Sequence, residues 1–182
     1  MTKILSFDPG GITGWAYVDT QRDTVFGGGQ ISGDGIEEYH FKLYQFIRQI
    51  KPDVIVYERF EYRANVEETY DEDTGQSMSS KGINLISRDY IGVIKLYTQV
   101  YKCQLVGQMP AQAVGKDNKI FFNMRKLKHM GLYVKGMPHQ IDATRHLLFY
   151  LMFTLNQKFY YHYIKPSTEQ LTLADYSTAI GE

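Results

Sequence analysis

The stretch LSFDPGGITGWAYVD, residues 5–19, decides the fold class of this chain. A mostly apolar run leads into Asp8, the turn residues Pro9–Gly11 follow, and a second apolar run begins at Trp15. Compact apolar runs are typical of buried strands, and the short gap between these two favours an antiparallel return of the chain. The first strand therefore ends on a carboxylate, beside a glycine-rich turn that leaves this carboxylate uncovered.

The composition limits the class of protein. The 182 residues suffice for one domain with a sizeable core, and the formal net charge of 0 provides no overall basic field for a nucleic-acid partner. Cys103 is the only cysteine, which excludes an internal disulfide and a cysteine-rich zinc site. Met1 leads directly into a strand, and the longest apolar run, residues 146–155, is far shorter than the roughly 20 residues that span a bilayer. We expect a soluble cytoplasmic protein with no membrane partner.

Hydrophobic periodicity predicts the order of the secondary-structure elements. Strands are expected at 4–7, 14–19, 24–31, 53–58 and 104–106, and helices at 36–50, 83–101, 116–130 and 138–156. Three strands followed by alternating helices and strands predict an α/β fold of the ribonuclease-H-like type. Its mixed five-stranded sheet would have three antiparallel strands and then parallel strands, flanked by helices.

Two segments stand apart from this predicted ribonuclease-H-like domain, which would occupy residues 1–157. Residues 63–82 are acidic in their middle and rich in serine and glycine at their end, which predicts a flexible surface loop. The tail at 158–182 is unusually aromatic. It can pack on the domain, pair with another subunit or contact a ligand, and the sequence does not distinguish these roles.

Acidic residues occur at three corresponding places. Asp8 and Glu58 each end a predicted strand, and Asp142 lies in an apolar helix. If the two strands are parallel neighbours, their ends lie about 5 Å apart, so the two carboxylates meet at one level of the sheet. Mg²⁺ or Mn²⁺ suits such a site, and two ions ~4 Å apart would support phosphodiester cleavage. The alternative is that Asp8 only caps its turn.

The last predicted helix carries further polar groups. His139, Asp142 and His146 are spaced i, i+3, i+7, so they share one helical face. His139 is a candidate metal ligand or proton carrier, with a solvent-facing or capping role as the alternative. For His146, which neighbours two leucines, we prefer that alternative. Arg145 is a candidate phosphate contact.

These motifs resemble those of the RuvC family of Holliday junction resolvases, particularly its phage-encoded members. The segments ILSFDPGGITGWAYV, PDVIVYERF and HQIDA are similar to the first, second and fourth motifs of that family, and the resemblance covers residues 3–157. It implies a ribonuclease-H-like homodimer in a bacterial or phage-infected cell, which makes paired, magnesium-dependent incisions in four-way DNA junctions. By position the resemblance implies that the metal ligands are Asp8, Glu58, His139 and Asp142. It also implies that Lys119 lies near the scissile phosphate, with Lys116 as a less certain substitute for that lysine.

The sequence also departs from the family pattern. His139 stands where many members have an acidic residue. An aromatic wedge follows the second motif in the family, and here Phe60 and Tyr62 bracket that position without matching it. The acidic residues at 67–73 are foreign to a surface that meets DNA, which puts junction recognition in question rather than the fold.

Basic residues gather in one segment of this neutral chain. Phosphate contacts from such a segment supply affinity without sequence specificity. The alternative is a helix with an ordinary solvated basic side. A homodimer would carry two copies of this basic surface and would place its two active sites opposite the two halves of a two-fold symmetric substrate. The residues in question are Lys116, Lys119, Arg125, Lys126, Lys128 and Lys135.

The sequence therefore supports the hypothesis of a structure-selective, two-metal endonuclease that cuts Holliday junctions and other branched DNA. A related nuclease specific for flaps, forks or RNA–DNA hybrids is an alternative, as is a DNA-binding relative without activity. A phosphotransferase of the actin and sugar-kinase type also uses a first-strand Asp-Gly turn. Such proteins need two similar halves and about twice this length, and no second glycine-rich turn occurs near residue 100.

Overall fold

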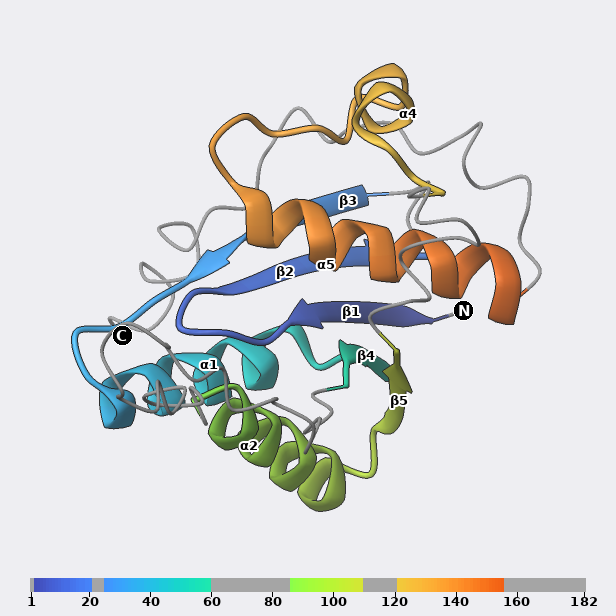
Figure 1. Cartoon of the computed structure of the whole chain (residues 1–182). Coiled ribbons are helices and arrows are strands. Elements are labelled where there is room, and N and C mark those ends of the chain that lie inside the picture. Colours follow the sequence, from blue (N-terminus) through green and yellow to red (C-terminus); the bar gives the residue numbers. More distant parts are fainter. Residues whose placement is uncertain (1, 21–24, 60–85, 110–120, 156–182) are drawn as a thin grey trace, which may run out of the picture.

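The computed structural model describes residues 2–20, 25–59, 86–109 and 121–155 (Figure 1). The predicted acidic loop and the aromatic tail lie outside these ranges. Within them, no helix has both the length and the apolar character needed to cross a membrane.

A five-stranded mixed sheet forms the centre of the fold, in the order β3-β2-β1-β4-β5. The first three strands pair antiparallel, whereas β4 is parallel to both β1 and β5. This arrangement confirms the predicted fold class. The strands are β1 Lys3–Asp8, β2 Thr13–Asp19, β3 Val25–Ile31, β4 Val54–Glu58 and β5 Gln104–Gln108.

Helices cover both faces of the sheet, which explains why the central strands are continuously apolar. Helices α1 (Ile36–Ile50) and α2 (Ile86–Tyr101) cover one face, and α5 (Pro138–Phe149) lies across the other (Figure 1). Alternate residues of each strand enter one of two cores. In β1, Leu5 and Phe7 face α1 and α2, whereas Ile4 belongs to the core beneath α5.

Most element boundaries lie within one residue of the sequence prediction, and three larger differences concern the site or the basic segment. Helix α4 (Met124–His129) begins later than expected, because the Asn123 side chain accepts a hydrogen bond from the Lys126 amide and caps it there. Strand β5 extends to Gln108, two residues beyond the predicted end. The last helix ends its α-helical part at Phe149 and continues as one π-helical turn, Tyr150–Thr154.

Candidate active site

The ends of three neighbouring strands place polar side chains on the α5 face of the sheet. Residues Phe7 and Tyr57 pair in register, so Asp8 and Glu58 follow side by side, and Glu58 pairs with Gln108 of β5. Side chains alternate along a strand, and the neighbours Phe7 and Tyr57 belong to the opposite core. Asp8, Glu58 and Gln108 therefore line one edge of the sheet beneath α5.

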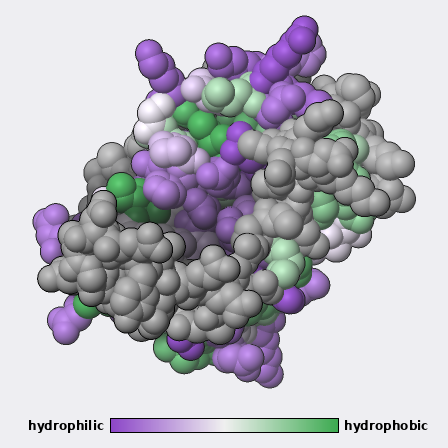
Figure 2. Space-filling view, viewed as in Figure 1, coloured by the Kyte–Doolittle hydropathy of each residue, from purple (hydrophilic) through white to green (hydrophobic). Residues whose placement is uncertain are grey.

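Helix α5 brings a histidine to each strand-end carboxylate. His139 Nδ1 lies 3.0 Å from Asp8 Oδ2, and His146 Nε2 lies 2.9 Å from Glu58 Oε2. The two histidines are seven residues apart and thus two turns along the same helical face. Figure 2 shows hydrophilic residues gathered in the middle of this face of the molecule, where α5 lies in Figure 1.

The third carboxylate is held within α5 itself. Arg145 donates one hydrogen bond to Asp142 Oδ1 and another to the backbone carbonyl of Phe122. The Arg145 side chain is only 13% exposed. The guanidinium of Arg145, a candidate phosphate contact from the sequence, orients Asp142 and ties α5 to the segment before α4.

The three carboxylates influence one another electrostatically. Burial raises the pKa of the Asp8 carboxyl above its ordinary value, and the hydrogen bond with His139 opposes that rise. The negative charges of Glu58 and Asp142 raise the same pKa further. Ionised Asp8 is therefore destabilised by burial and by the two neighbouring carboxylates, a cost that a bound cation would relieve.

The donor types suit a hard divalent cation, since three carboxylates and one imidazole supply oxygen and nitrogen ligands. Each carboxylate nevertheless has a basic partner: His139 for Asp8, His146 for Glu58 and Arg145 for Asp142. Across the described ranges, no three His, Cys, Asp or Glu side chains lie close enough together to hold one metal ion. The metal set therefore stays a prediction, whereas the paired carboxylates are a feature of the structure.

Gly14 fixes where α5 begins relative to the sheet. A Cβ atom on Gly14 would overlap the backbone carbonyl of His139, so only glycine permits this approach. The sequence predicts that the turn glycines Gly10 and Gly11 form the tight turn that leaves Asp8 uncovered. A Cβ atom on Gly11 would meet nothing within 4 Å, and neither Gly10 nor Gly11 has a positive φ. The glycine that positions the site is therefore Gly14, which immediately precedes the second apolar run.

His146 differs from the interpretation preferred in the sequence analysis. Its side chain is 0% exposed, and both ring nitrogens have partners, since Nδ1 lies 2.7 Å from Gln108 Oε1. It is neither solvent-facing nor a helix cap. The i, i+7 spacing from His139 was the available signal, but Gln108 was missed because the predicted strand ended two residues too early.

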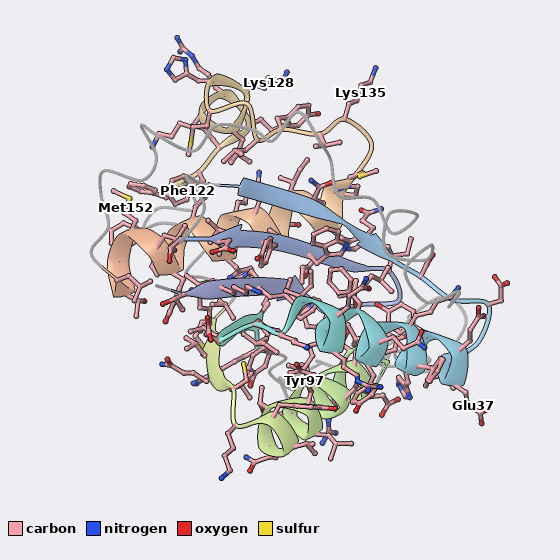
Figure 3. All side chains as sticks on the ribbon, turned by 180° about the vertical axis from the view of Figure 1, so that it is seen from behind. Glu37, Tyr97, Phe122, Lys128, Lys135 and Met152 are labelled. Atoms are coloured by element: carbon pink, nitrogen blue, oxygen red, sulfur yellow. The ribbon has the colours of Figure 1, made fainter. Side chains whose placement is uncertain are left out.

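The basic segment is only partly described. Arg125, Lys126 and Lys128 are exposed on α4, and Figure 3 shows Lys128 and Lys135 projecting away from the body of the protein. Lys126 Nζ donates to the Phe121 carbonyl at 2.8 Å, and its cation lies 4.2 Å from the Phe121 ring centroid. The remaining predicted DNA contacts, among them the predicted catalytic lysine, lie outside the described residues: Phe60, Tyr62, Lys116 and Lys119.

Comparison with known proteins identifies the fold. No protein-family model matches the chain, and no curated protein sequence matches it. RuvC of Thermus thermophilus, in complex with a Holliday junction substrate, is 13% identical with a TM-score of 0.57, over 86% of this chain and 97% of that one. The fowlpox virus resolvase bound to Holliday junction DNA is 11% identical with a TM-score of 0.53, over 81% and 97% of the two chains.

A third solved structure, the yeast mitochondrial Holliday junction resolvase Ydc2, is 12% identical. Its TM-score is 0.53, over 88% of this chain and 82% of that one. At these identities the comparisons establish a shared fold. The chain thus has the ribonuclease-H-like fold of RuvC-type resolvases, as its sequence predicts.

Proposed function

We propose that this protein is a metal-dependent endonuclease that cuts four-way DNA junctions and related branched DNA. The observation that carries the proposal is the placement of Asp8 and Glu58 at adjacent ends of parallel strands, beneath a helix that carries His139 and Asp142. The fold supports the same proposal, because two of the similar structures were solved with Holliday junction DNA.

The proposed metal ligands are Asp8, Glu58, Asp142 and His139. Bound there, one or two Mg²⁺ or Mn²⁺ ions would supply Lewis-acid chemistry for phosphodiester hydrolysis, which activates water and offsets charge on the leaving oxygen. His139 is the partner best able to exchange its hydrogen bond with Asp8 for another contact, because its side chain is 40% exposed. Arg145 fixes the orientation of the Asp142 carboxylate on α5 through the hydrogen bond described above.

Other residues have proposed roles in binding DNA. Lys119 would offset negative charge on the scissile phosphate. The exposed lysine and arginine side chains of α4 would contact the phosphate backbone of the DNA. The cut would leave 5′-phosphate and 3′-hydroxyl ends. The proposed assembly is a homodimer, in which two sites face the two-fold junction, and analytical ultracentrifugation with and without junction DNA measures its mass.

The experiment that tests the function uses the purified protein and a set of labelled substrates of equal length. We expect cleavage of a four-way junction in Mg²⁺ and in Mn²⁺, weaker cleavage of forks and flaps, and no cleavage in EDTA. Linear duplex is the control and remains intact. Preferred cutting of a fork, a flap or an RNA–DNA hybrid would replace the proposed substrate with that one.

A second candidate is a protein that binds junctions without cutting them. The observation that favours it is the pairing of every site carboxylate with a basic side chain. Retained junction binding with no cleavage in either metal would support this candidate over the nuclease.

A further inference from the structure

His146 is an interior group of α5 with two polar contacts. Its imidazole is fully buried, and it bridges Glu58 at the end of β4 and Gln108 at the end of β5. Gln108 is itself only 3% exposed. A buried imidazole is costly unless both nitrogens have partners, and here both do. Neither nitrogen is therefore available as a metal ligand, in contrast to the more open His139.

The hydrogen-bonding chemistry fixes the direction of the contact with Glu58. An ionised carboxylate only accepts hydrogen bonds, so in the contact with an ionised Glu58 the Nε2–H group of His146 is the donor and Oε2 is the acceptor. At Nδ1, an amide offers either kind of partner: its oxygen accepts from a protonated nitrogen, and its NH₂ group donates to a bare one. In the structure Gln108 Oε1 faces Nδ1 and accepts from a protonated nitrogen. With the amide turned over, its NH₂ group would donate to a bare Nδ1 instead, and Nε2–H faces Glu58 in both cases.

We propose that His146, held by Gln108, is a positioning residue that sets the orientation of the Glu58 carboxylate at the edge of the sheet. This proposal rests on the proposed function, in which Glu58 is a metal ligand. A glutamate has several rotatable bonds, and Glu58 is at the very end of its strand. The buried contact reaches Glu58 through Oε2 from the core side, so it restricts the carboxylate without occupying the solvent side.

The test compares four proteins by Mn²⁺ titration, monitored by electron paramagnetic resonance, and by thermal melting. His146→Leu removes both hydrogen bonds and keeps an apolar volume in the core. His146→Gln retains a donor toward Glu58. Thr144→Val is the matched control, because Thr144 is fully buried on the same helix and its hydroxyl donates only to the Gln140 carbonyl.

We expect His146→Leu to bind Mn²⁺ about 10–100-fold more weakly, the usual effect of losing a group that orients a ligand. It should also melt at a lower temperature, because the buried Gln108 amide loses its partner, so binding is measured well below the melting temperature of every variant. His146→Gln recovers most of the affinity, and Thr144→Val keeps the wild-type affinity. If His146→Leu and Thr144→Val bind Mn²⁺ equally well, the positioning role is wrong. If the wild type itself binds no Mn²⁺, the metal-dependent function fails as well.

A spectroscopic measurement tests the contact without metal or DNA. Long-range ¹H–¹⁵N NMR reports which ring nitrogen of His146 carries a proton. The expected result is a protonated Nε2 whose signal is protected from exchange and moves in Glu58→Gln. A bare Nε2 in the wild type would overturn the proposal even if the protein cuts junctions.

Discussion

Asp8→Asn is expected to abolish junction cleavage and, at the same time, to stabilise the metal-free protein. The carboxylate is a proposed metal ligand, and losing several kcal/mol of transition-state stabilisation lowers the cleavage rate by about 10³-fold or more. Junction binding should remain, because phosphate contacts supply most of the affinity for DNA. Cleavage rates and gel-shift affinities measure the two effects separately.

The stabilisation follows from the pKa of Asp8. Because burial raises this pKa in the folded state, the folded protein holds the Asp8 proton more tightly than the unfolded chain does. The contribution of Asp8 to the free energy of unfolding therefore falls as the pH rises through the raised pKa of Asp8. At neutral pH the ionised carboxylate lowers the stability of the folded protein. Asparagine removes the charge and still accepts a hydrogen bond from His139. The gain is present at pH 7 and narrows as the pH falls through the raised pKa of Asp8.

Thermal unfolding in EDTA at several pH values measures this gain. Asp34→Asn, which alters an exposed acid before α1, is the control and should change neither cleavage nor pH dependence. Equal cutting by the wild type and Asp8→Asn would mean that the chemistry lies elsewhere. A metal-free Asp8→Asn protein that is less stable at pH 7 would contradict the assigned electrostatics.

Gly14→Ala is expected to damage both stability and cleavage. The added methyl group would overlap the backbone carbonyl of His139, and a backbone atom cannot rotate away as a side chain does. Overpacking of this kind costs about 1–3 kcal/mol, or roughly 2–10 °C in melting temperature for a chain of this size. The start of α5 must also shift. A displacement near 1 Å at reacting groups lowers rates about 10²-fold.

Gly11→Ala is the matched control for this change. It adds the same methyl group three residues earlier, in the turn before β2, where nothing lies within 4 Å of the added Cβ atom. We expect its free energy of unfolding to stay within about 0.5 kcal/mol of the wild-type value. If the two variants are equally stable, Gly14 does not set the position of α5.

Much of this architecture follows from local signals in the sequence. The apolar runs that end on Asp8 and Glu58 predict two buried strands, and the chain order predicts that they are parallel neighbours. Helical spacing correctly places His139 and Asp142 on one face of α5. These features are predictable because strand burial and helical periodicity are properties of short segments.

Other features depend on contacts between distant segments, which no single segment reveals. The clash that makes Gly14 necessary involves a residue 125 positions later, and the partner of His146 is set by the register of β4 and β5. An imidazole among leucines has no local signature that separates a buried bridge from an exposed group. The late start of α4 is an exception, because Asn123 is a recognisable cap residue.

The central claim is that carboxylates from β1, β4 and α5 together bind divalent cations. The direct measurement is Mn²⁺ binding to the wild type, Asp8→Asn, Glu58→Gln and Glu37→Gln, with no DNA present. Glu37 is the control, since it projects from the start of α1 on the far side of the sheet (Figure 3). We expect saturable binding to the wild type and to Glu37→Gln, and a loss of at least about tenfold in affinity in each of the other two variants. Equal affinity in all four proteins would contradict the claim.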